Sequence, residues 1–143
     1  MTDAADLRGG VGDVWAAEWR RPDRAFVGLN PSRNRAILAD APTGPFRALD
    51  IGCGAGATAI ALATARPDAM VRGVDISAAL VATARERAGP LANLSFDVGD
   101  VLDRAPADAP FDLLFSRHGV MFFADSAAAF RILRESTAPG GAL

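Results

Sequence analysis

The sequence predicts an α/β fold in which helices flank a mostly parallel β-sheet. From Phe46 onward, segments with the apolar pattern of strands alternate with segments that have the pattern of helices, as is typical of parallel sheets. Three glycines at every second position, Gly52, Gly54 and Gly56, separate the first strand from the first helix. A chain of 143 residues, half of them hydrophobic, is long enough for one such domain.

The first part of the chain is expected to be helical and to precede the sheet. We assign residues 1–45 to an N-terminal helical segment or lid and residues 46–143 to the sheet domain. Residues 1–12 are polar and glycine-rich, so we expect them to be loosely attached. Helices are predicted over 13–21 and 31–39, the second with proline at its first position.

Two tryptophans distinguish the first predicted helix. Trp15 and Trp19 lie four residues apart and therefore share one face of this helix, which Pro22 is expected to end. They either anchor the helix to the body of the domain or cover a bound ligand.

The sheet domain is predicted to contain four strands and the beginning of a fifth. The four strands are expected at 46–51, 70–75, 94–98 and 111–115, with helices at 56–65, 78–88 and 125–137. The two prolines of 99–110 predict a loop there, and Pro139-Gly140-Gly141 is expected to end the last helix. Ala142 and Leu143 would begin the fifth strand, which leaves one apolar edge of the fourth strand unpaired. Such an edge favours self-association, so we expect a homo-oligomer formed through it.

Composition and charge narrow the classes of partner. The net charge is −2 and no basic stripe is present, so nucleic acid is not favoured. No segment approaches about 18 uninterrupted apolar residues, and the N-terminus has no apolar signal region, so we expect a cytoplasmic protein with no membrane partner. A single cysteine, Cys53, excludes an internal disulfide and a cysteine-cluster metal site.

Three aspartates stand at or near the ends of the first three predicted strands. Asp50 is on the strand that leads into the glycine turn, Asp75 ends the second strand, and Asp100 follows the third. Asp75 can accept hydrogen bonds from both hydroxyls of a ribose, and Asp100 can accept one from an exocyclic amine such as that of adenine. Since no phosphate-binding cation accompanies them, the set favours a cationic adenosine-containing ligand over a polyphosphate.

A dinucleotide site is the alternative reading of the same turn. Gly52-x-Gly54-x-x-Ala57 satisfies the relaxed fingerprint of NAD and FAD sites, which would make the protein an NAD-dependent oxidoreductase. Asp50 disfavours a dinucleotide site, because its carboxylate would lie near the pyrophosphate at the helix N-terminus and repel it.

Five motifs in this order resemble those of class I S-adenosylmethionine-dependent methyltransferases. They are Leu49-Asp50-Ile51-Gly52-Cys53-Gly54-Ala55-Gly56, Gly73-Val74-Asp75-Ile76-Ser77, Val98-Gly99-Asp100-Val101, Phe111-Asp112-Leu113-Leu114-Phe115-Ser116 and Leu133-Arg134-Glu135 with Pro139-Gly140-Gly141. The resemblance covers about residues 46–143 and is strongest to small-molecule methyltransferases. It implies a Rossmann-like sheet, usually of seven strands, so this chain resembles a C-terminally shortened member.

The resemblance also implies a role for individual residues toward S-adenosyl-L-methionine. The glycine turn would approach the methionine portion, whose amino group would lie near Asp50. Asp75 would hold the ribose, and Ile76, Asp100 and Val101 would contact adenine. The cofactor-binding residues implied are Asp50, Gly52, Cys53, Gly54, Gly56, Asp75, Ile76, Asp100, Val101 and Ser116.

The segment after the fourth strand is the candidate for acceptor chemistry. His118, the single histidine, is placed to act as a catalytic base, a wall of the substrate pocket or a structural residue. Arg117 either pairs with an acidic substrate or faces solvent, and we expect the second. Met121, Phe122 and Phe123 are expected in the core rather than around a substrate.

The sequence thus predicts a methyltransferase that acts on an unidentified small-molecule acceptor. The alternative is a catalytically weak S-adenosylmethionine-binding module that acts by association, and an NAD-dependent oxidoreductase ranks third.

Overall fold

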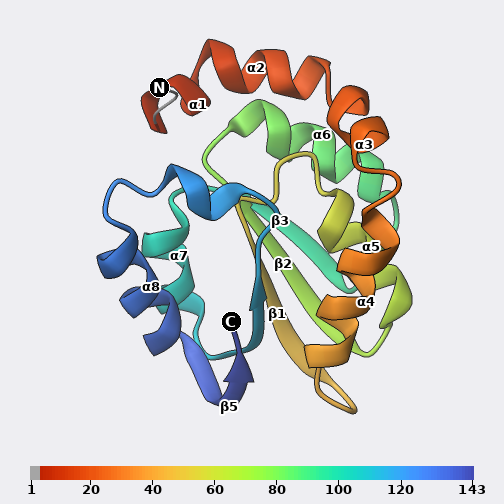
Figure 1. The fold of residues 1–143 in the computed structure, drawn as a ribbon, viewed down its shortest axis with the longest axis vertical. Helices are drawn as coiled ribbons and strands as arrows, with labels where there is room; N and C mark the ends of the chain where they lie inside the picture. The colour runs from red at the N-terminus through yellow and green to blue at the C-terminus, as the bar shows by residue number, and fades with distance from the viewer. Residues whose placement is uncertain (1–3) are drawn as a thin grey trace.

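The structure, a computed structural model that describes residues 4–143, contains one parallel five-stranded sheet (Figure 1). Its strand order is β3-β2-β1-β4-β5, and every neighbouring pair is parallel. The strands are β1 (Phe46–Ile51), β2 (Ala69–Asp75), β3 (Leu94–Val98), β4 (Phe111–Phe115) and β5 (Thr137–Ala142). This arrangement confirms the α/β fold class predicted from the alternating pattern.

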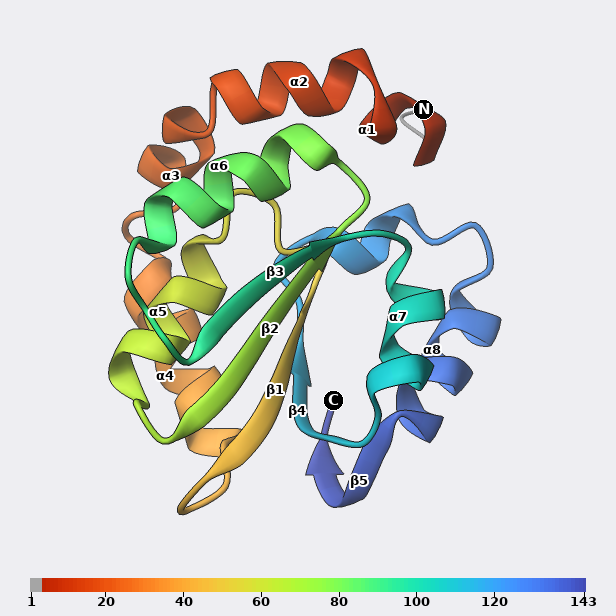
Figure 2. The ribbon, with the colours of Figure 1, turned by 180° about the vertical axis from the view of Figure 1, so that it is seen from behind.

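Helices cover both faces of the sheet (Figures 1 and 2). One face carries α4 (Asn30–Asp40), α5 (Ala57–Ala65) and α6 (Ala78–Ala88), and the other carries α7 (Val101–Asp108) and α8 (Ser126–Glu135). A 3₁₀ turn, η1 (Gly119–Phe122), connects β4 to α8. Within residues 4–143, no helix is long and apolar enough to cross a membrane.

Alternate side chains of β1 divide the core into two layers. Phe46 and Ala48 belong to the cluster beneath α5 and α6, whereas Leu49 and Ile51 belong to the cluster beneath α7 and α8. This is expected for a central strand, because successive side chains point to opposite faces of the sheet. By the same alternation, Asp50 lies on the side of Phe46 and Ala48. It is the one charged residue of β1 that is fully buried.

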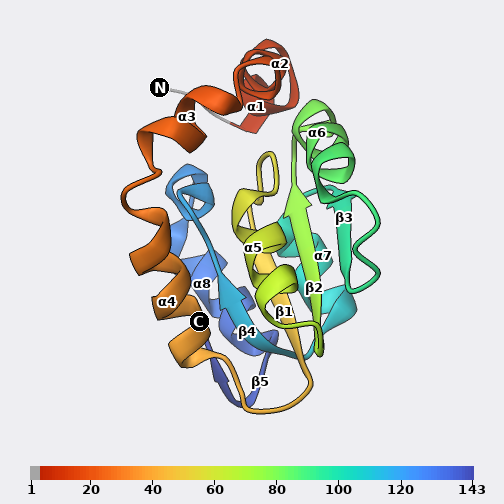
Figure 3. The same cartoon turned by 90° about the vertical axis from the view of Figure 1, so that its right-hand side faces the viewer.

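The N-terminal segment forms three short helices that arch over one end of the sheet (Figure 3). They are α1 (Ala4–Arg8), α2 (Gly10–Ala17) and α3 (Arg20–Ala25). The prediction that 1–12 are loosely attached is therefore wrong for 4–12, where Leu7 is buried; residues 1–3 lie outside the described residues. Pro22 does not end a helix but lies in the first turn of α3, where its missing N–H has no intrahelical partner to lose.

The helix α2 packs closely on the N-terminus of α6. Gly12 is buried, and a Cβ atom built on it would lie 2.5 Å from Ser77 Oγ, closer than side chains tolerate. Ser77 caps α6 by accepting a hydrogen bond from the Leu80 N–H at 3.3 Å. The absence of a side chain at position 12 thus lets the two helices meet directly above the end of β2.

The segment predicted as a loop between β3 and β4 contains the helix α7. Asp100 caps it by accepting a hydrogen bond from the Leu102 N–H at 2.9 Å, and Val101 and Ala105 are buried. Pro106 lies inside this helix and was the reason for the incorrect prediction. Pro106 removes one intrahelical hydrogen bond of this eight-residue helix. The packing of α7 on the sheet outweighs that loss.

The fifth strand begins earlier than predicted and pairs with β4. Phe111 is opposite Thr137 and Leu113 is opposite Ala142, with an irregularity between these pairs. Pro139, Gly140 and Gly141 belong to β5, which lies at the edge of the sheet, where proline and glycine are tolerated. The edge of β4 that we expected to be open, and to support self-association, is therefore occupied.

Candidate functional site

The glycine turn connects β1 to α5 with three left-handed residues. Gly52, Gly54 and Gly56 have φ angles of 63°, 54° and 81°, which explains why glycine occupies each position. A Cβ atom on Gly52 would lie 2.6 Å from Gly119 Cα, whereas one on Gly54 would have no neighbour within 4 Å. The turn is thus packed against the β4–α8 connection on one side and open on the other.

The open side faces a large cavity of about 1170 Å³ at the carboxyl ends of the strands. The cavity is lined by all of the predicted site residues except Gly56 and Ser116. Gly56 instead packs against Phe96 and Ala84, and the Ser116 hydroxyl donates to the Ile51 carbonyl at 2.7 Å. These two residues hold neighbouring elements together rather than lining the cavity.

Asp50 is the most buried charged group of the cavity wall. The residue is 1% exposed, and its Oδ2 atom has no hydrogen-bond partner among the described residues. Burial raises the pKa of Asp50 to about 7, and the Arg117 guanidinium opposes this shift. An unpartnered buried carboxylate oxygen that faces a cavity needs a donor, and a ligand with an ammonium group would supply one.

The pKa of Asp50 makes a pH dependence of binding predictable. A ligand ammonium pairs with the ionised carboxylate, so affinity for S-adenosylhomocysteine should rise up to about tenfold per pH unit toward pH ~7 and then level off. Calorimetry between about pH 5.5 and about pH 8.5 measures this, and Asp50→Asn should remove the slope. An equal slope in that variant would contradict the assignment to Asp50.

The raised pKa of Asp50 also makes the stability of the ligand-free chain depend on pH, and this dependence runs in the opposite direction to that of ligand affinity. Folding favours the neutral form of Asp50, so this group stabilises the fold below its ordinary pKa of 3.8 and loses that contribution as the pH rises toward about 7. Ligand binding and folding therefore place opposing demands on the ionisation of Asp50.

Asp75 joins the end of β2 to the glycine turn. One carboxylate oxygen accepts from the Gly54 N–H at 2.8 Å, and the other accepts from the Ser77 N–H at 2.9 Å. Burial raises the pKa of Asp75, and these N–H donors oppose the shift. An ionised carboxylate has about four lone-pair sites, so two remain for hydroxyl groups of a ligand.

Cys53 and Asp100 have limited chemical roles in this geometry. The Cys53 thiol is buried, and burial raises its pKa well above the ordinary value, which opposes formation of a reactive thiolate. One Asp100 oxygen caps α7, so the same carboxyl group both fixes that helix and lines the cavity.

The end of β4 presents Arg117 and His118 to the cavity. His118 adopts a left-handed φ of 72°, and its ring packs on Phe26 of the α3–α4 connection with centroids 5.1 Å apart. Among residues 4–143 no group hydrogen-bonds its imidazole, so no hydrogen bond from these residues orients it as a base. Met121, Phe122 and Phe123 also line the cavity. The prediction that they lie in the core holds in part for Phe123, which packs against the cluster beneath α7 and α8, and is wrong for Met121, which is exposed.

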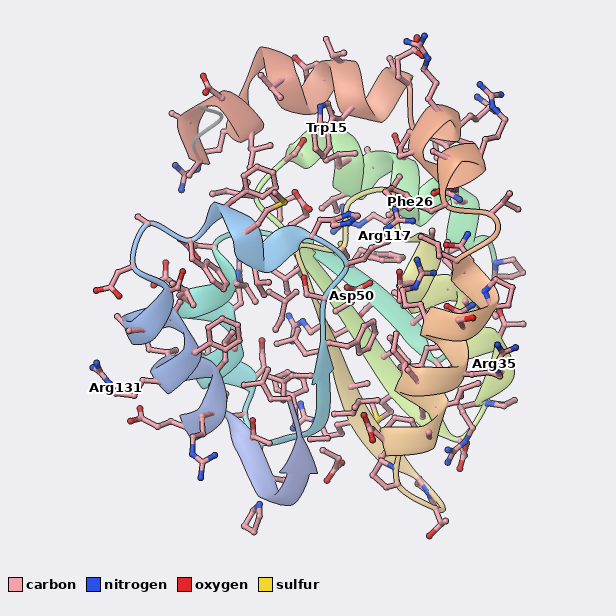
Figure 4. The ribbon with its side chains drawn as sticks, in the orientation of Figure 1. Trp15, Phe26, Arg35, Asp50, Arg117 and Arg131 are labelled. Carbon is pink, nitrogen blue, oxygen red and sulfur yellow. The ribbon has the colours of Figure 1, made fainter. Side chains whose placement is uncertain are left out.

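The roof of the cavity comes from the N-terminal helices, and sequence reasoning missed most of it. Trp15 meets Phe122 edge-to-face with centroids 6.3 Å apart, and Asp23 and Phe26 lie on the cavity wall. The spacing of Trp15 and Trp19 was the available signal, and both residues line the cavity. Figure 4 shows Trp15 above Phe26 and Arg117, with Asp50 beneath them at the end of β1.

Comparison with known proteins identifies the family. Residues 48–141 match the model of the methyltransferase domain family, which is most of the chain. The chain belongs to the class I S-adenosylmethionine-dependent methyltransferases. This confirms the resemblance recognised from the five motifs.

Individual relatives are similar to this chain over most of its length. A trans-aconitate 2-methyltransferase of Streptomyces coelicolor is 36% identical over 115 residues, which cover 76% of this chain and 36% of that protein. Phosphoethanolamine N-methyltransferase 1 of Arabidopsis thaliana is 33% identical over 96 residues, or 66% of this chain and 19% of that protein. The chain thus spans well under half the length of these curated relatives.

Solved structures share the fold of this chain. A Methanococcus maripaludis protein described as an S-adenosyl-L-methionine-dependent methyltransferase superposes with a TM-score of 0.74 at 27% identity, covering 90% of this chain and 60% of that one. A Haemonchus contortus phosphoethanolamine methyltransferase, solved with S-adenosylhomocysteine, gives a TM-score of 0.65 at 31% identity, covering 77% and 26%.

Proposed function

We propose that this chain binds S-adenosyl-L-methionine in the cavity and transfers its methyl group to a small-molecule acceptor. The observation that carries the proposal is the unpartnered Oδ2 of buried Asp50, in a cavity wall that also contains the open Gly54. A cationic amino acid portion fits this carboxylate, whereas a pyrophosphate beside it would be repelled. The family membership supports the same choice.

The chain's own residues would bind and orient the two reactants. The spare lone pairs of Asp75 would accept the ribose hydroxyls, and Ile76, Asp100 and Val101 would surround adenine. When bound, the cofactor supplies a sulfonium-activated methyl group, which leaves with the sulfur keeping the electron pair while a bond to the acceptor forms. The protein's contribution is then alignment and exclusion of water by the roof of α1–α3.

The size and lining of the cavity support a small acceptor. A volume of about 1170 Å³ exceeds that of most single-ligand pockets, which leaves room for an acceptor beside the cofactor. The curated relatives named above act, by their names, on trans-aconitate and on phosphoethanolamine, both small molecules. No general base is required for an acceptor that is already a nucleophile, which agrees with the unoriented imidazole of His118.

Calorimetry with three ligands tests this proposal. We expect S-adenosylmethionine and S-adenosylhomocysteine to bind the 143-residue chain and NADH not to bind. Binding of NADH in place of the other two would instead support an oxidoreductase. Transfer of labelled methyl groups to a panel of small acceptors then separates an enzyme from a module that only binds.

A further inference from the structure

Arg117 is a cationic side chain held at the cavity wall rather than in solvent. Its side chain is 19% exposed and lines the cavity, contrary to our expectation that it faces water. By contrast, Arg35 on α4 and Arg131 on α8 are exposed on the outside of the molecule (Figure 4). The backbone around Arg117 is fixed, because Ser116 is bonded to Ile51 and Gly119 touches Gly52.

The hydrogen-bonding capacity of Arg117 is largely unused. Among residues 4–143, its one hydrogen-bond partner is Asp23 Oδ1, at a long 3.5 Å from Nη1. Asp23 is already engaged more closely by Arg87, whose Nη2 lies 2.6 Å from Asp23 Oδ2. A guanidinium has five N–H donors, so most of those on Arg117 are available to a group inside the cavity.

The charges around Asp23 leave one positive charge without a close partner. Two guanidinium groups, Arg87 and Arg117, share the single carboxylate of Asp23. Arg87 is further stabilised over the Trp19 ring, 3.7 Å from its centroid, so it is the closer and better-held member of the pair. Arg33, which is hydrogen-bonded to Asn30 and Asn34, and Arg117 both act electrostatically on Asp50. Three guanidinium groups, those of Arg33, Arg87 and Arg117, therefore share two carboxylates, those of Asp23 and Asp50. One surplus charge matches a monoanionic group better than a doubly charged phosphate.

We propose that Arg117 binds the acceptor and that the acceptor is a small molecule with a carboxylate group. This rests on the proposed methyl transfer and names the acceptor class for that same site. The planar guanidinium suits a carboxylate geometrically, and Phe26 beside it provides an apolar surface for the body of the acid. Arg117 would thus orient the acceptor at the end of β4, next to the glycine turn.

A purely structural role for Arg117 makes a different prediction. In that case Arg117 would serve only to hold α3 against the sheet domain through its ion pair with Asp23, as Arg87 of α6 does. Arg87→Met is therefore the matched control, because it removes the closer ion pair on the same carboxylate and Arg87 itself does not line the cavity. Arg117→Lys keeps the charge but loses the fork of donors.

Ligand-observed NMR on the chain saturated with S-adenosylhomocysteine tests the proposal. The probes are trans-aconitate, benzoate and octanoate, each paired with its neutral amide. We expect at least one acid to bind the wild-type chain and Arg87→Met about 10- to 100-fold more tightly than its amide. Arg117→Met should bring that ratio to about one, and Arg117→Lys should restore part of it.

Several results would overturn the proposal. They are an absence of any acid preference in the wild-type chain, an unchanged preference in Arg117→Met, or an equal loss in Arg117→Met and Arg87→Met. A loss of affinity for S-adenosylhomocysteine but not for 5′-methylthioadenosine in Arg117→Met, with acid binding unchanged, would assign Arg117 to the cofactor's own carboxylate. If S-adenosylhomocysteine does not bind the wild-type chain at all, the proposed function fails rather than the role of Arg117.

Discussion

Asp75→Ala is expected to lower the affinity for S-adenosylhomocysteine by about 100-fold or more. Each hydrogen bond from a ribose hydroxyl to an ionised carboxylate contributes roughly 1.5–3 kcal/mol, and the variant loses two of them. The same change also leaves the Gly54 and Ser77 N–H groups without their partner, so the glycine turn loses a support as well. Calorimetry of the purified variant measures the total effect.

A second ligand pair separates the two causes. Adenosine should bind the wild-type chain more tightly than 2′,3′-dideoxyadenosine, and in Asp75→Ala this difference should disappear. Asp97→Ala is the matched control, since Asp97 pairs with Arg72 on the neighbouring strand and does not line the cavity. If the ribose preference persists in Asp75→Ala, Asp75 acts on the turn alone.

Gly52→Ala is expected chiefly to lower the stability of the fold, whereas Gly54→Ala is expected chiefly to weaken ligand binding. Both residues have positive φ, which costs an alanine about 1–2 kcal/mol at either site. At Gly52 the added methyl group also meets the backbone of Gly119, 2.6 Å away, so we expect a loss of stability of several kcal/mol. At Gly54 the methyl group meets no protein atom but projects into space on the cavity side, so ligand binding should suffer instead.

Thermal unfolding and calorimetry distinguish these outcomes. Gly52→Ala should show a large fall in Tm, whereas Gly54→Ala should show only the smaller fall expected from backbone strain and should bind S-adenosylhomocysteine weakly. Equal losses of stability in the two variants would show that backbone strain, and not the contact with Gly119, dominates at Gly52.

The central strands and the cofactor side of the site could be predicted because local sequence determines them. The apolar runs of β1 and β4 and the glycine turn between β1 and α5 are explained by their own residues. Asp50 and Asp75 lie where the strand ends predicted them, since strands in a parallel sheet present their carboxyl ends at one edge.

The errors fell on elements whose conformation depends on tertiary contacts. The helix α7 tolerates Pro106 because it packs on the sheet, and β5 accepts Pro139 because it lies at an edge. The first twelve residues have a polar, glycine-rich composition, yet Gly12 is needed for the contact with Ser77. Arg117 could not be placed from its sequence neighbours, because Asp23, its ion-pair partner, is 94 residues away.

The two hydrogen bonds that the Asp75 carboxylate accepts from backbone N–H groups lower the entropy cost of ligand binding. The carboxylate that would meet the ribose already fixes Gly54 and Ser77 in the free chain. The backbone entropy of the glycine-rich turn is therefore lost during folding and not again when the ligand arrives. Such preorganisation removes the ordering of the turn from the conformational cost of loading the cavity.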